Sequence, residues 1–118
     1  MKNTFTVFLK KKLMLALAFL LLIFIINPIT KAGTFSSTAT GNWGSAGTWT
    51  LTSGTDPDGI PDADDVVNIT GGFTVTVAAA AACSTLAISA SSTLIVGGFT
   101  FAVSDNTTID GILTSRNF

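Results

Sequence analysis

The amino-acid sequence predicts an all-β protein, and we expect a parallel β-solenoid that follows an N-terminal leader. Two observations predict the strands: after residue 33, branched and aromatic residues alternate with polar ones, and glycine-containing pairs separate these short runs. A third observation predicts the stacking: one segment recurs 26 residues later. Fixed periods of about 20–50 residues are typical of stacked supersecondary units. A β-sandwich is the alternative, because sequence rich in Ser, Thr and Gly repeats by chance.

Residues 1–32 have the pattern of a secretory signal peptide. A basic segment comes first, the apolar run Leu13–Ile26 follows with fourteen residues and no charge, and Thr30 and Ala32 are small residues suited to a cleavage site after Ala32. We therefore expect residues 33–118 to be secreted or held at the cell surface, with membrane contact only through the leader before cleavage. An uncleaved membrane anchor is the alternative, although the apolar run is shorter than the roughly 20 residues that a spanning helix needs.

The charges divide at the predicted cleavage site. All five lysines lie before residue 33, whereas all seven acidic residues are Asp and lie after it. The segment 33–118 therefore has one basic side chain, Arg116, and contains no Lys, His, Glu or Tyr. General acid–base catalysis depends mainly on such side chains, so the composition argues against an enzyme. It also excludes the basic surface that nucleic-acid binding requires.

The expected strands show period-two alternation of apolar and polar residues. In the clearest run, 73–77, the side chains of Phe73, Val75 and Val77 would share one face. Such a face is buried when the strand packs against a core, which makes these residues candidates for the core. Further alternating runs are 86–88, 94–96 and 99–103, and the expected turns are Gly71-Gly72, Gly97-Gly98 and Asp110-Gly111.

The internal repeat favours the stacked architecture over the sandwich. Residues 71–77 recur as residues 97–103, and the same shift of 26 pairs Leu86 with Ile112. Coils of about 20–26 residues built from short strands suit a β-solenoid. On this interpretation the module 33–118 has roughly three to four coils, and its last coil exposes apolar residues. We therefore expect the module to be truncated at its C-terminal end.

One pattern of residues resembles a known kind of module. Gly41-Asn42-Trp43, Thr48-Trp49 and Asp65–Ile69, followed by alternating strands, look like the N-terminal module of large secreted bacterial surface proteins, many of them adhesin-like and exported by type IX secretion. The resemblance covers about residues 36–115. It implies the start of a right-handed parallel β-solenoid within an extracellular protein, and no catalytic motif comes with it.

The loop 54–65 is the part of the chain with distinctive chemistry, because five of the seven Asp residues lie between positions 56 and 65. Carboxylates this close repel one another unless a cation neutralises them, and oxygen-rich loops with a sharp glycine turn favour calcium. Aligned with an EF-type calcium loop, Gly59 takes the glycine position, whereas Gly54 stands where the first ligand would be. The candidate calcium ligands are Asp56, Asp58, Asp62 and Asp65.

The same loop also resembles one thrombospondin type 3 calcium repeat, over this loop only. That resemblance implies the same four Asp ligands, and again the first Asp of the pattern is missing. The alternative is a solvated turn, because Pro57, Gly59 and Pro61 enforce irregular backbone and Asp favours turns by bonding to nearby amides.

Trp43, Trp49 and Cys83 are the other residues with distinctive chemistry. An exposed Trp can stack on a sugar ring or anchor a protein interface, so Trp43 and Trp49 are candidate ligand-binding residues. Alternatively both cover the open end of the first coil, because a solenoid needs a cap on its apolar end. The single cysteine allows no internal disulfide, and we expect Cys83 to be a small buried residue.

Together these observations predict a non-catalytic structural or adhesive module of a secreted or cell-surface protein, with glycans or other surface proteins as candidate partners. A carbohydrate-binding module that uses the two Trp residues is one alternative. A fragment of a glycan-active β-helix enzyme is another, but a calcium-assisted lyase would need a basic residue near the metal and a hydrolase would need two placed carboxylates. The segment 33–118 offers only Arg116 for the former role.

Overall fold

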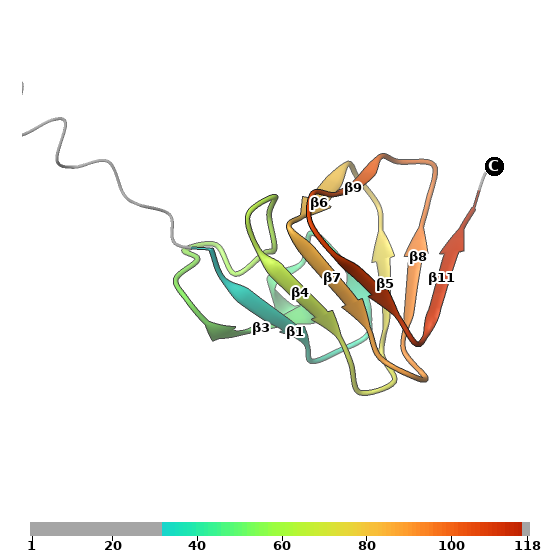
Figure 1. Cartoon of the computed structure of the whole chain (residues 1–118), viewed down its shortest axis with the longest axis horizontal. Helices are drawn as coiled ribbons and strands as arrows, with labels where there is room; N and C mark the ends of the chain where they lie inside the picture. The colour runs from blue at the N-terminus through green and yellow to red at the C-terminus, as the bar shows by residue number, and fades with distance from the viewer. Residues whose placement is uncertain (1–31, 117–118) are drawn as a thin grey trace, which may run out of the picture.

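The computed structural model describes residues 32–116, so the predicted signal peptide, except Ala32, lies outside the described residues. Within them the structure is built of strands and one short 3-10 turn (Figure 1). None of the helical structure in this part of the chain is long and apolar enough to cross a membrane. The elements are β1 (Thr34–Ser37), β2 (Gly41–Asn42), η1 (Ala46–Thr48), β3 (Trp49–Ser53), β4 (Val66–Ile69), β5 (Thr74–Val77), β6 (Ala81–Cys83), β7 (Thr85–Ile88), β8 (Thr93–Val96), β9 (Phe101–Val103), β10 (Thr107–Ile109) and β11 (Ile112–Ser115).

The strands form three sheets, in the orders β10-β7-β4-β1-β3, β11-β8-β5-β2 and β6-β9. Every pairing between described strands is parallel except that of β1 with β3. From β4 onward the chain visits the three sheets in turn, so from β7 onward each strand lies beside the equivalent strand of the previous circuit (Figure 1). The prediction of an all-β fold with parallel strands is confirmed.

The register of the sheets differs from the 26-residue repeat that the sequence suggested. Val66 of β4 pairs with Thr85 of β7, and Thr74 of β5 pairs with Thr93 of β8, a shift of 19 positions in each case. The shift is 20 between β6 and β9 and 21 between β7 and β10. From β4 onward the strands therefore stack at 19–21 residues, whereas the first circuit is longer, with shifts of 32 between β1 and β4 and 34 between β2 and β5. Backbone pairing follows the length of each circuit and not the local likeness of two segments.

The two glycine pairs that suggested the longer period occupy different conformations. Gly71 and Gly72, in the turn between β4 and β5, both have positive φ values of 71° and 75°. Gly97 and Gly98, in the turn after β8, do not. Positive φ is the conformation that glycine adopts without a steric penalty, so only the first pair needs glycine for this reason. Residues 71–77 and 97–103 are thus similar in sequence but do not occupy equivalent positions in the fold.

The core lies between the sheets and is made of side chains stacked in columns. In β4, β5 and β7 alternate residues are buried, as the period-two pattern predicted. Val67 pairs with Leu86 and Ile69 pairs with Ile88, so apolar residues of successive circuits lie directly on one another. Cys83 is also buried in this core, as expected.

The two ends of the stack differ. At one end β3 pairs antiparallel with β1, and Trp43 and Trp49 join the buried core. At the other end β10 and β11 are edge strands, and several large apolar side chains are exposed. These exposed residues are Phe99, Ile109, Ile112 and Leu113.

Candidate functional site

The acidic loop, residues 54–65, connects β3 with β4 and bonds to its own backbone. Asp56 Oδ1 accepts hydrogen bonds from the amides of Asp58 at 3.0 Å and Gly59 at 3.1 Å. Asp58 Oδ1 accepts one from the amide of Ile60 at 2.9 Å. Asp favours turns because it makes such bonds, and here they fix the path of the loop. Residues 56–60 therefore have the side-chain to backbone bonds expected of a solvated turn, the alternative to a calcium site.

Asp65 links the loop to the folded core. Its side chain is only 2% exposed. Its Oδ1 accepts a hydrogen bond from the amide of Gly33 at 2.6 Å, and its Oδ2 accepts one from the amide of Asp62 at 2.8 Å. Burial raises the pKa of the Asp65 carboxyl group; the amides of Asp62 and Gly33 lower it, and the charges of Asp62 and Asp56 raise it further. Within residues 32–116, the groups that influence this pKa include no cation.

Three carboxylates of the loop converge on one point. One oxygen from each of Asp56, Asp62 and Asp65 lies within 4.8 Å of the other two. Asp62 is exposed, Asp56 is half-buried and Asp65 is buried, so the cluster runs from the surface to the core. A pocket of about 110 Å³ adjoins it. Since hard cations prefer carboxylate oxygens, these three residues could hold a metal ion.

Asp58, the fourth candidate from the sequence, is not part of this triad. Its side chain is exposed and caps the amide of Ile60, although it lines the same small pocket. Gly54, which replaces the first Asp of the calcium pattern, has a positive φ of 87°, and a Cβ there would collide with the carbonyl oxygen of Ala32. The loop therefore lacks a first ligand because its backbone requires glycine at that position.

The two Trp residues are buried, 3% exposed for Trp43 and 5% for Trp49. Their rings meet edge to face with centroids 5.0 Å apart, and the Trp43 ring meets Phe101 in the same way at 4.9 Å. Trp49 Nε1 donates to the Trp43 carbonyl at 2.7 Å. This placement agrees with a cap on the core and leaves little ring surface for a sugar.

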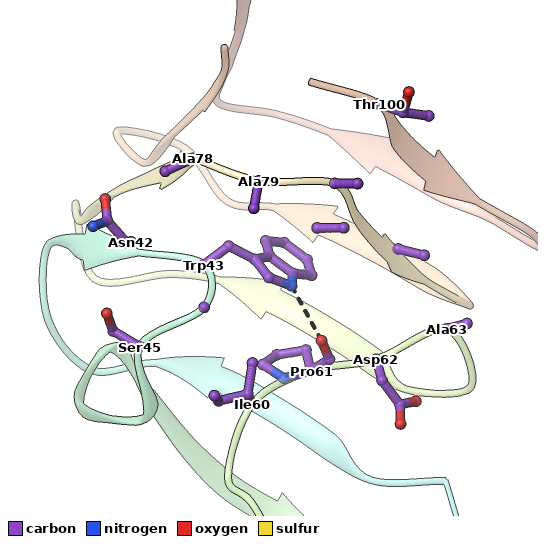
Figure 2. Close-up of a pocket in the computed structure, with 14 residues that line it drawn as sticks. Asn42, Trp43, Ser45, Ile60, Pro61, Asp62, Ala63, Ala78, Ala79 and Thr100 are labelled. Carbon is purple, nitrogen blue, oxygen red and sulfur yellow. Dashed lines mark hydrogen bonds between the residues drawn. The ribbon is translucent and has the colours of Figure 1, made fainter. Parts of the chain in front are cut away.

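Trp43 also connects the acidic loop to the cap. Its Nε1 donates a hydrogen bond to the carbonyl oxygen of Pro61 at 3.1 Å (Figure 2). The ring lies beside a cleft of about 630 Å³ that separates residues 60–63 of the loop from the alanine run 78–82. Asp62 is the only ionisable side chain among the described residues that line this cleft. The cleft therefore has mainly small apolar walls and no pair of acid–base groups.

Sequence reasoning did not find two contacts of this site, those of Gly33 with Asp65 and of Trp43 with Pro61. Their partners are 32 and 18 positions apart, and no local pattern links them. Only the position of Gly33, directly after the predicted cleavage site, could have drawn attention to it.

Comparison of the chain with protein-family models, with curated proteins and with solved structures gives no match.

Proposed function

We propose that this chain is a non-catalytic structural or adhesive module of a secreted or cell-surface protein, built as a right-handed parallel β-solenoid. The observation that carries the proposal is the stacking of strands in parallel register, at 19–21 residues from β4 onward. A β-sandwich is built of antiparallel sheets, whereas here β1 and β3 form the only antiparallel pair of the described strands. A stack of this kind offers an extended surface without needing a catalytic centre.

The side chains available for chemistry support a non-catalytic role. The large cleft contains one carboxylate, Asp62, and the remaining acidic groups of the site lie together on one loop. A glycosidase needs two carboxyl groups on opposite sides of the bond to be cleaved. Incubation of the purified protein with acidic and neutral polysaccharides should release no product. Release of oligosaccharides, abolished by Asp62→Asn, would overturn the proposal in favour of a glycan-active enzyme.

Export is the second part of the proposal and is supported by the leader sequence 1–32. N-terminal sequencing of the protein recovered from the medium or cell surface should begin at Gly33. An Ala32→Lys variant, which removes the small residue before the cleavage site, should accumulate uncleaved. Recovery of only the full-length, membrane-bound chain would contradict cleavage and favour a membrane anchor.

Calcium is the metal that the carboxylate triad suits best, because calcium takes several oxygen ligands in flexible loops. At about 10 mM calcium, a site with a Kd of roughly 0.1–1 mM would stabilise the fold by about 1.4–2.7 kcal/mol. Thermal melts should therefore shift upward by several degrees, and Asp62→Asn should abolish the shift. Asp58→Asn is the matched control, because Asp58 lies on the same loop outside the triad. If both variants lose the calcium-induced shift of the melt equally, the triad is not the calcium site.

The cleft beside Trp43 is the one observation that favours a second function, carbohydrate binding. A glycan array probed with the protein would reveal it. Ala79 is exposed and lines the cleft, so Ala79→Arg should block a ligand there without disturbing the core. Glycan binding that survives Ala79→Arg would place the ligand elsewhere, and the absence of binding to any glycan would leave the structural role.

A further inference from the structure

We propose that the acidic loop has a second cation available to it, the protein's own mature amino terminus: cleavage after Ala32 turns the Gly33 nitrogen into an ammonium group that pairs with the buried carboxylate of Asp65. The proposal rests on the export and cleavage put forward above. It assigns to leader removal a direct effect on the stability of the folded module.

The geometry needed for this pair already exists in the uncleaved chain. The Gly33 nitrogen lies 2.6 Å from Asp65 Oδ1, in a buried position. The Gly33 carbonyl oxygen accepts a hydrogen bond from the amide of Val66 at 2.9 Å, which holds the residue against the start of β4. A Cβ on Gly33 would press against Leu51 and Phe35, so the backbone is closely packed. The nitrogen would keep its partner after cleavage without moving.

Cleavage changes the charge at this nitrogen. Hydrolysis of the bond between Ala32 and Gly33 by a leader-removing protease adds one water molecule, leaving a carboxylate on Ala32 and an ammonium group on Gly33. An α-amino group is positively charged at neutral pH. The single amide N–H that binds Asp65 is thereby replaced by three donors. The amide bond to the ionised Asp65 carboxylate already has one charged partner, and cleavage adds the attraction between two opposite charges.

Ala32 also occupies the position from which the new terminus would face the other carboxylates. It lines the pocket of about 110 Å³ together with Asp56, Asp62 and Asp65. Removing Ala32 opens this pocket at the Gly33 nitrogen and makes its two additional donors available to the neighbouring carboxylates. The triad then gains a cation that needs no supply from the medium.

Few other cations are available to the mature chain. Residues 33–118 contain no lysine, and the one arginine, Arg116, follows β11 at the opposite end of the stack from β3. The α-amino group is therefore the only amine of a chain that comprises residues 33–118. This property allows a direct test, because an amine-reactive reagent can modify only that group.

The experiment compares the chain 33–118 carrying a free amino group with the same chain acetylated at Gly33. All described strands and core residues follow Gly33, so the chain keeps every sheet of the described structure. Acetylation restores a neutral amide N–H and removes only the charge. In chelator and low salt, we expect the unfolding equilibrium constant, measured by urea denaturation, to be about tenfold larger for the acetylated chain.

Two charge variants locate the partner of the ammonium group. Asp65→Asn should abolish the difference between free and acetylated chains, whereas Asp105→Asn, which removes an exposed carboxylate elsewhere, should preserve it. Equal stability of the free and acetylated chains, or an undiminished difference in Asp65→Asn, would overturn the proposal.

The reactivity of the amine tests the pair even if Asp65→Asn does not fold. The free amine at Gly33 should react with an acylating reagent at least tenfold more slowly in the native protein than in a chain that begins at Ala32. In that chain the ammonium group is displaced by about 3.8 Å along the backbone. Equal rates would refute the buried pair. These results concern the folded chain alone, so they stand apart from the sequencing experiment that tests whether cells cleave the leader.

Discussion

Replacement of Trp43 tests whether one side chain joins the cap, the core and the acidic loop. Trp43 makes edge-to-face contacts with Trp49 and Phe101, and its indole N–H binds the Pro61 carbonyl oxygen. Trp43→Ala removes all three interactions and leaves a cavity, for which we expect a loss of about 3–5 kcal/mol. The two aromatic contacts account for about 0.5–1.5 kcal/mol each of this loss.

Trp43→Phe separates the hydrogen bond from the ring. Phenylalanine retains a ring beside Trp49 and Phe101 but has no N–H, so the buried carbonyl of Pro61 loses its donor. An unsatisfied buried acceptor costs about 1–3 kcal/mol, and we expect the Phe variant to lie between wild type and Trp43→Ala.

Urea denaturation followed by circular dichroism provides the free energies of unfolding, and an unchanged dependence on urea would show that the same surface unfolds in each protein. Phe99→Ala is the control, because Phe99 is 50% exposed and should cost less than about 1 kcal/mol. If Trp43→Ala is no more destabilising than Phe99→Ala, Trp43 does not support the cap. If Trp43→Phe costs nothing, the bond to Pro61 does not anchor the loop.

Three further predictions concern other parts of the molecule. A Cβ at Gly111 would collide with the carbonyl oxygens of Ser89 and Ser92, whereas one at Gly98 meets nothing within 4 Å, so thermal melts should show Gly111→Ala to be strongly destabilising and Gly98→Ala nearly neutral. Burial raises the pKa of the Cys83 thiol to about 11 from 9.0. The folded state therefore favours the neutral thiol, and the free energy of unfolding should fall by roughly 2–3 kcal/mol as pH rises from below 9 toward 11. Urea titrations of Cys83→Ala should lack this fall. If the Gly33 ammonium group and calcium share the triad, calorimetry should show weaker calcium binding to the free chain than to the acetylated one, and equal affinities would contradict competition.

The strands could be predicted from sequence because their signal is local. Val75 and Val77 are buried in β5, as the alternation in residues 73–77 indicated. The partner of each strand could not be predicted, because pairing depends on the length of a whole circuit. The local likeness of two glycine-containing segments therefore suggested a period of 26, whereas the backbone pairs at 32–34 in the first circuit and at 19–21 from β4 onward.

The acidic loop shows the same division between local and long-range information. The density of Asp residues identified the loop, and Asp56, Asp62 and Asp65 do converge. The sequence could not show that Asp58 caps a neighbouring amide, nor that Asp65 is buried beside Gly33. Likewise the spacing of Trp43 and Trp49 was compatible with either an exposed or a buried pair, and only the packing of the cap distinguishes them.

The parallel sheets also determine how the molecule would respond to mechanical force. Hydrogen bonds between β4 and β7, and between β5 and β8, run along the direction in which the strands stack. Tension along that direction would peel one strand from the next and break the bonds a few at a time. Tension parallel to the strands would shear the bonds of a whole strand together. A module of this design therefore withstands drag best when its attachments direct the load along the strands.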